Sequence, residues 1–198
     1  MISKTLFTRI SSASVLIGSL GVAAMGCSAA YDDSTSSDSV TGASEALSSC
    51  GVDVPNPILN VPAGNKLSLE LDAVGVQIYA CQATGWVFQA PEADLYRDGH
   101  LVGKHYVGPT WEYQDGSKVV GARVAGFTPD PSSIPWLLLR AVSNAGEGQM
   151  SKVTFIQRLD TSGGLAPTSG CDAEHVGAVA RVDYTARYAF YKASDSCL

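Results

Sequence analysis

The sequence predicts a single all-β domain, an antiparallel β-sandwich or barrel built as a meander of hairpins with one short helical turn. From Lys66 onward, short runs rich in Val, Tyr, Phe, Leu and Trp are separated by Gly, Pro and Asp-Gly, which is the spacing of short strands and turns. No stretch keeps an apolar repeat of helical period for three turns. We therefore expect strands throughout and no long helix.

The first two predicted strands cover residues 66–71 and 74–82. In the first, leucines at odd positions alternate with polar residues. In the second, the apolar residues at even positions from Val74 to Ala80 alternate with the residues at odd positions from Gly75 to Cys81. Each segment has the period of two that a half-buried strand requires.

Two hairpins are predicted at Asp98-Gly99 and Asp115-Gly116, because this dipeptide suits a two-residue left-handed turn and extended runs flank both copies. A two-residue loop fixes which residues face each other across the hairpin. The expected cross-strand pairs are Arg97 with His100, Tyr96 with Leu101, Glu92 with His105, Gln114 with Ser117, and Glu112 with Val119.

The remaining predicted strands lie in the second half of the chain. Residues 136–142 are apolar on both faces apart from Arg140, which is typical of a strand in the middle of a sheet. Residues 179–184 and 188–191 return to strand. Before them, Asp172 can cap a short helical turn that Gly177 ends.

The N-terminus has the layout of a bacterial lipoprotein signal. Lys4 and Arg9 precede an uncharged apolar run, and small residues lead into Cys27, which would carry the lipid. The run is interrupted by serines and is shorter than the roughly 20 apolar residues of a spanning helix. The open alternative is an ordinary secretory signal cleaved after Ala29 or Ala30, which would release a soluble secreted protein.

These features divide the chain into three parts. Residues 1–26 are the predicted signal peptide, and residues 27–49 are a Ser- and Asp-rich stretch with the composition of a flexible tether. Residues 50–198 form the β domain. The residue after the lipid cysteine is not acidic, so we expect sorting to the outer membrane of the bacterial cell envelope.

The other four cysteines form an even set, as expected in an oxidising compartment. Four cysteines allow three pairings. Their positions favour Cys50 with Cys197, tying the ends of the domain, and Cys81 with Cys171 inside it. The chain has no C-x-x-C or His-rich spacing, so we expect no metal site.

The charge balance limits the possible partners. The chain has 13 Lys and Arg residues against 19 Asp and Glu residues, with a formal net charge of −6. Removing residues 1–26 takes away two basic side chains and no acidic one. Because no Lys/Arg cluster occurs, we expect neither nucleic acid nor an anionic lipid surface as a partner. Contact with the membrane would run through the lipid alone.

Several segments resemble the exported bacterial and fungal family known as domain of unknown function 3455. They are VGVQIYAC (74–81), WVFQAPEADL (86–95), GKHYVGPTWE (103–112), DGSKVVG (115–121), PWLLLRA (135–141), IQRL (156–159), the Gly pair at 163–164, and GCDA (170–173). The resemblance implies a secreted or lipid-anchored, β-rich protein and no established activity. The chain has no Gly-x-Gly-x-x-Gly turn, so we expect no dinucleotide and no other cofactor.

Residues 105–112 are the first candidate site. His105, Trp111 and Glu112 lie around Gly108-Pro109, and together they can bind a sugar face or polarise a water molecule. The alternative is structural. Glu112 and Glu92 would then pair with Lys or His across the sheet, and Trp111 would belong to the core.

Charged residues in apolar strands give a second candidate. Arg140, Gln157 and Arg158 lie in or beside apolar runs, where a charge must be paired or face a cavity. If they converge with Glu112 and His105, an acidic or hydroxylated ligand would fit inside the domain. The alternative is a salt bridge from Arg140 to Glu70 or Asp72.

Asp172 and His175 are the third candidate, as an orienting carboxylate and a base, or simply as a cap beside a surface histidine. No Gly-x-Ser-x-Gly elbow occurs, so the residues favour a binding protein over an enzyme. We predict an envelope-anchored module that binds a small or carbohydrate ligand. The alternatives are a hydrolase using Glu112 and His105 and a purely structural envelope protein.

Overall fold

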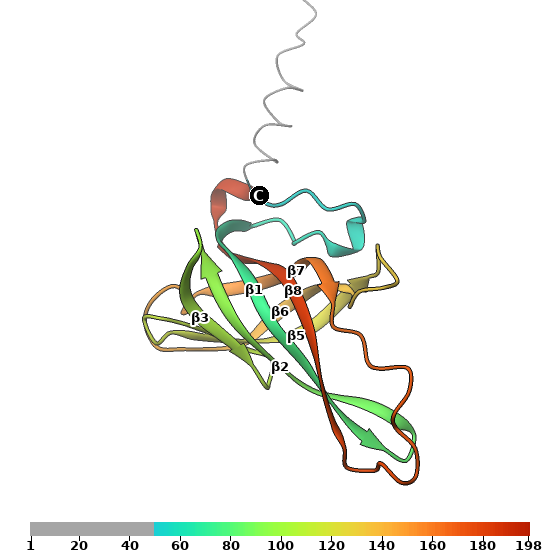
Figure 1. The fold of residues 1–198 in the computed structure, drawn as a ribbon. Coiled ribbons are helices and arrows are strands. Elements are labelled where there is room, and N and C mark those ends of the chain that lie inside the picture. The colour runs from blue at the N-terminus through green and yellow to red at the C-terminus, as the bar shows by residue number, and fades with distance from the viewer. Residues whose placement is uncertain (1–49) are drawn as a thin grey trace, which may run out of the picture. The chain divides into compact units, whose positions relative to one another are not determined.

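A computed structural model describes residues 50–198, which form an eight-stranded β domain (Figure 1). The strands are β1 (Asn65–Gln82), β2 (Gly85–Arg97), β3 (His100–Tyr106), β4 (Thr110–Tyr113), β5 (Lys118–Phe127), β6 (Trp136–Ala145), β7 (Val153–Gly163) and β8 (Val179–Ala193). Two short 3-10 helices, η1 (Pro57–Leu59) and η2 (Asp195–Cys197), flank them. The predicted signal peptide, tether and Cys27 lie outside the described residues.

All eight strands pair antiparallel with their sequence neighbours, and β8 pairs with β1 to close a barrel. The all-β prediction is confirmed, and the open choice between sandwich and barrel is resolved. Closure leaves no sheet edge, so every strand has a partner on both sides. Strand alternation sends one set of side chains into the barrel and the other outward.

The interior is filled by large apolar side chains from several strands. Leu69, Leu71, Leu95, Trp111 and Tyr188 are all buried in one cluster. β1 is a single strand of 18 residues where the sequence predicted two. Its odd positions therefore face inward along its whole length. The expectation that Val74 and the even positions after it form the buried face is wrong, because Val74 is 54% exposed whereas Gln77 is 2% exposed.

The first hairpin has its predicted turn. Asp98 and Gly99 both adopt positive φ, and Arg97 pairs with His100 and Tyr96 with Leu101. A bulge follows between Leu95 and Tyr96, so that Ala93, not Glu92, pairs with His105. The extra residue shifts the register by one.

The second hairpin also differs from its predicted register. The Tyr113 N–H donates to the Ser117 carbonyl oxygen, so the loop has three residues where two were expected. Gln114 therefore does not pair with Ser117, and Glu112 pairs with Lys118, not with Val119. Asp115 accepts hydrogen bonds from the backbone N–H and hydroxyl of Ser117, which stabilises the longer loop.

An N-terminal strap, residues 50–62, crosses the outer face of β5, β6 and β7. Leu59 is fully buried and packs with Leu138 and Leu159, with Trp136 and Phe155 beside them. The Cys50–Cys197 disulfide ties this strap to the end of the chain, and Figure 1 shows both at the same end of the barrel. The strap explains why β6 is apolar on both faces: one faces the interior and the other lies under the strap.

The far ends of β1, β2 and β8 run out beyond the rest of the barrel as an arm (Figure 1). The Cys81–Cys171 disulfide joins β1 to the loop that precedes β8, so both predicted pairings are confirmed. Asp172 accepts from the Glu174 N–H, but residues 172–177 form turns without a helix. The helical turns lie instead at η1 and η2.

The two disulfides indicate a protein of an oxidising, extracytoplasmic compartment. Within residues 50–198, no helix has the length and hydrophobicity needed to cross a membrane.

Candidate functional site

A cavity of about 620 Å³ lies inside the barrel, within the 300–1,000 Å³ range of small-molecule sites. Its inner wall contains Trp111, Leu139 and Tyr188, and the β3–β4 turn at Val107 to Pro109 lies at its mouth. Exposed Phe88 also lines it. Because alternate turns of a meander lie at the same end, the mouth is at the end of the barrel that carries the arm.

His105 is a buried imidazole ring in the cavity wall. It is 3% exposed, stacks on Trp111 with ring centroids 4.3 Å apart, and meets the Tyr188 ring edge at 5.1 Å. Its Nδ1 lies 2.9 Å from the Thr110 carbonyl oxygen. A carbonyl oxygen only accepts, so Nδ1 carries the ring proton and Nε2 is left as an acceptor.

The pKa of His105 is lowered to about 3. Burial is the main cause, the Thr110 hydrogen bond opposes it, and the positive charge of Arg158 adds to it. His105 is therefore neutral at physiological pH.

Two further polar groups of the wall have no hydrogen-bond partner. The Gln77 Nε2 and the Trp111 Nε1 are buried donors without an acceptor among the described residues, and both side chains line the cavity. A buried donor without an acceptor costs roughly 1–3 kcal/mol. An oxygen-bearing ligand in the cavity would remove this cost.

Arg158 brings a positive charge into the barrel. Its Nε and Nη2 donate to the Pro135 carbonyl oxygen at 3.0 and 2.8 Å. Burial raises the pKa of the Tyr188 hydroxyl, and the nearby Arg158 guanidinium opposes this rise. Within the described chain, no carboxylate forms an ion pair with Arg158.

Glu112 does not join His105 in this cavity. It lies on the outer face of β4, where it accepts from the Tyr106 hydroxyl at 2.8 Å and pairs with Lys118 at 3.1 Å. These two hydrogen bonds lower the pKa of Glu112. Trp111 and Glu112 are neighbours on one strand and point to opposite faces, so the sheet separates Glu112 from His105 and they form no catalytic pair. Glu92 is also outside and pairs with Arg181.

Arg140 and Gln157 also lie away from the cavity. Arg140 is exposed on the outer face of β6, so the expectation that it is buried is wrong. The salt bridge expected with Glu70 or Asp72 is not formed, since Glu70 pairs with Arg187.

Gln157 is 1% exposed under the N-terminal strap. It donates to the Leu59 carbonyl oxygen at 2.8 Å and accepts from the Tyr191 hydroxyl at 2.6 Å. Only His105, Trp111 and Arg158 of the predicted candidates meet in the cavity, so the expected convergence is partly wrong.

Asp172 and His175 are together but exposed. The His175 Nδ1 lies 2.7 Å from an Asp172 carboxylate oxygen, and this bond lowers the pKa of Asp172. The pair lies on the loop before β8, outside the barrel cavity. No group of three or more His, Cys, Asp or Glu side chains within residues 50–198 is arranged to hold a metal ion.

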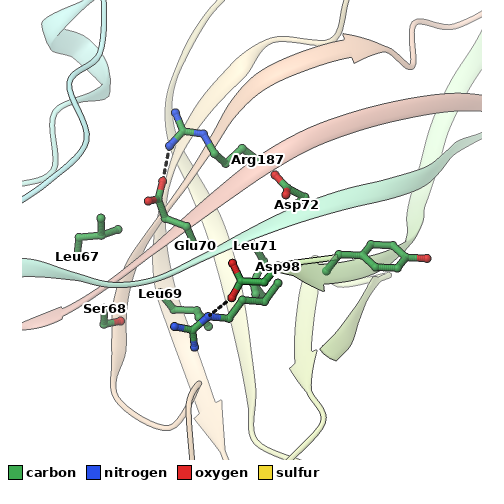
Figure 2. Close-up of a pocket in the computed structure, with 10 residues that line it drawn as sticks. Leu67, Ser68, Leu69, Glu70, Leu71, Asp72, Asp98 and Arg187 are labelled. Atoms are coloured by element: carbon green, nitrogen blue, oxygen red, sulfur yellow. Dashed lines mark hydrogen bonds and ion pairs between the residues drawn. The ribbon is translucent and has the colours of Figure 1, made fainter. Parts of the chain in front are cut away.

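A second hollow, of about 510 Å³, lies on the outer surface beside β1 and the β2–β3 hairpin (Figure 2). Most of its charged groups already pair with one another, and Asp72 is the exception among its lining residues. Figure 2 shows Arg187 with Glu70, and Arg97 Nε lies 3.9 Å from Asp98. An exposed groove whose charges have partners offers less to a ligand than the barrel interior does.

Gln77, Tyr188 and Arg123 are cavity residues that the sequence analysis did not select. Gln77 carried a detectable signal, because extending the odd-numbered leucines of β1 by a period of two places it on the inner face. Tyr188 and Arg123 reach the cavity only because the barrel closes, and no local sequence pattern predicts that closure.

Comparison with known proteins gives a family without a named activity. The family described as "Protein of unknown function (DUF3455)" matches residues 62–192, a range that covers all but the last residue of the barrel strands. No curated protein and no solved structure matches the chain. The chain belongs to the DUF3455 family.

Proposed function

We propose that this protein is an exported, lipid-anchored binding module that holds a small molecule inside its barrel. One observation carries the proposal: the cavity encloses polar groups whose hydrogen bonds the protein itself does not complete. Gln77 and Trp111 offer buried donors there, and Arg158 offers a charge. Native interiors seldom leave such groups unpaired, so a bound molecule accounts for them.

A screen of thermal stability tests the binding function. We expect compounds from a panel of sugars, organic acids and apolar small molecules to stabilise the purified protein. A ligand at 100 times its dissociation constant adds about 2.7 kcal/mol. If no compound stabilises it, and native mass spectrometry finds no co-purified molecule, the protein is a structural envelope component.

A matched pair of variants locates the site. Leu137 lines the cavity, whereas Val142 lies on the same strand, 53% exposed and outside it. Leu137→Trp should fill the cavity and abolish the ligand-induced shift, and Val142→Trp should retain it. Equal shifts in both variants would place the ligand elsewhere.

The anchoring proposal is tested separately. Labelled palmitate should attach to the full-length protein in a bacterial host and should not attach to Cys27→Ser. If the wild type stays unlabelled and is released from the cells, the chain carries an ordinary cleaved secretory signal.

A further inference from the structure

The cavity has an electrostatic character opposite to that of the whole chain. Its lining includes Arg123 and Arg158 and no Asp or Glu, although the chain has a net charge of −6. The described carboxylates that form ion pairs belong to exposed or half-exposed side chains. The protein therefore keeps its acidic groups outside and gives the barrel interior a positive charge.

Arg158 has donors to spare. Guanidinium carries five N–H donors. In Arg158, Nε and Nη2 donate to the Pro135 carbonyl oxygen, and the Tyr188 hydroxyl is a further neighbour of the guanidinium. The bond to Pro135 fixes one edge of the guanidinium, and these two partners do not use all five donors. A charge taken partly out of water is costly without a counter-ion, and the described protein supplies none inside the barrel.

Two uncharged N–H groups in the cavity wall also need a hydrogen-bond acceptor. Gln77 Nε2 and Trp111 Nε1 both lack an acceptor. Both unpartnered groups are N–H donors, so a ligand satisfies them with oxygen acceptors and not with donors. His105 is uncharged and adds no further cation. Arg123 is exposed, so half-buried Arg158 is the more enclosed of the two positive charges in the lining.

Most of the remaining wall is apolar, although Gln89 also lines the cavity. Pro91, Leu137 and Leu139 line the cavity together with the Trp111 ring, and Phe88 and Val107 lie at its mouth. These surfaces suit a hydrocarbon or aromatic body that loses contact with water on binding. A polyhydroxylated sugar would place most of its hydroxyls against carbon atoms. A dianionic phosphate would find one half-buried arginine, Arg158, for its two charges, because Arg123 is exposed.

We propose that the barrel cavity selects an amphipathic carboxylate, with the carboxylate on Arg158 and the buried N–H donors and the apolar body against the carbon-lined wall. Carboxylate and guanidinium match in shape as well as in charge. This inference rests on the proposed small-molecule function, since it specifies the ligand class of the same cavity.

Three probes share a naphthalene ring and differ in their head group: 2-naphthoate, 2-naphthamide and 2-naphthylmethylammonium. Comparing their affinities separates selection of the head group from binding of the apolar ring. Isothermal titration on the purified wild-type protein should show the carboxylate binding roughly tenfold or more tightly than the amide, as expected for a hydrogen bond to a charged group. The ammonium probe should bind weakest. This comparison needs no variant, so it does not depend on any substitution being tolerated.

Two variants then assign the preference to Arg158. Arg158→Gln should reduce carboxylate affinity to that of the amide, and Arg158→Lys should restore part of the preference. The matched control is Arg140→Gln, an exposed arginine on the outer face of the neighbouring strand, which should leave all three affinities unchanged.

The outcomes distinguish the two proposals. If all three probes bind with equal affinity, the cavity is a small-molecule site but the selection of carboxylates is wrong. A preference for the ammonium probe would also overturn it. If none binds and the thermal screen is negative as well, the binding function fails and this inference fails with it.

Discussion

At the scale of single residues, His105 is held neutral by its surroundings. Its ring lies between Trp111 and Tyr188, and Arg158 also disfavours a second positive charge. In the unfolded chain the imidazole has a pKa near 6.5, whereas in the folded protein the pKa is about 3. The unfolded state therefore binds a proton between these values and the folded state does not. The stabilising effect of a neutral His105 is complete above about pH 6.5 and is lost as the pH falls toward 3.

We expect His105→Phe to remove this pH dependence. Between about pH 6 and 4, the free energy of unfolding of the wild type should fall more steeply than that of the variant, by about 1.4 kcal/mol per pH unit. Phenylalanine keeps the stacking on Trp111 and has no proton to bind. Urea denaturation of both proteins across this range measures the difference. Parallel pH profiles would show that the His105 ring is protonated in the folded protein.

At the scale of elements, local patterns predicted the strands and turns better than the register between them. The Asp98-Gly99 turn and the strand around Trp136 could be found from composition alone. The bulge beside Leu95 and the three-residue loop after Tyr113 could not, because an Asp-Gly pair does not determine the loop length and no residue pattern marks the extra residue. One inserted residue reverses which side chains face inward beyond it, and for this reason the expected pairing of Glu92 with His105 failed.

The N-terminal strap should be the element most dependent on its disulfide. A Cys50→Ser/Cys197→Ser variant should lose about 2–5 kcal/mol of unfolding free energy and expose the strap to limited proteolysis within residues 50–62. The control, Cys81→Ser/Cys171→Ser, removes the disulfide of the arm and should leave the strap protected. If the strap resists cleavage without Cys50–Cys197, the burial of Leu59 against Leu138 and Leu159 holds it without covalent help.

At the scale of the whole molecule, barrel closure decides the candidate site. His105 and Trp111 pair across the β3–β4 hairpin, whereas Arg158 lies on β7. Only closure of the barrel brings these two distant segments to one cavity. The prediction for Arg140 was wrong because both faces of β6 are apolar, one against the barrel interior and one under the strap. The residue pattern of such a strand does not show which face is the interior. The strap covers the outer face at Leu138 and ends before Arg140, a difference that no pattern within β6 records.

The closed sheet should open at β4 before it opens elsewhere. β4 has 4 residues, whereas β1 has 18 and pairs with β8 along most of its length. Few ladder hydrogen bonds need to break to separate β4 from β5, and Trp111 in β4 lines the cavity. Native-state hydrogen exchange should therefore show β4 amides opening at a lower free energy than those of Leu69 to Ala73, which should exchange only on global unfolding.

A ligand inside the barrel contacts Trp111 and should slow the β4 amides selectively. Uniform protection of β4 and the β1–β8 seam would mean that the barrel opens only as a whole.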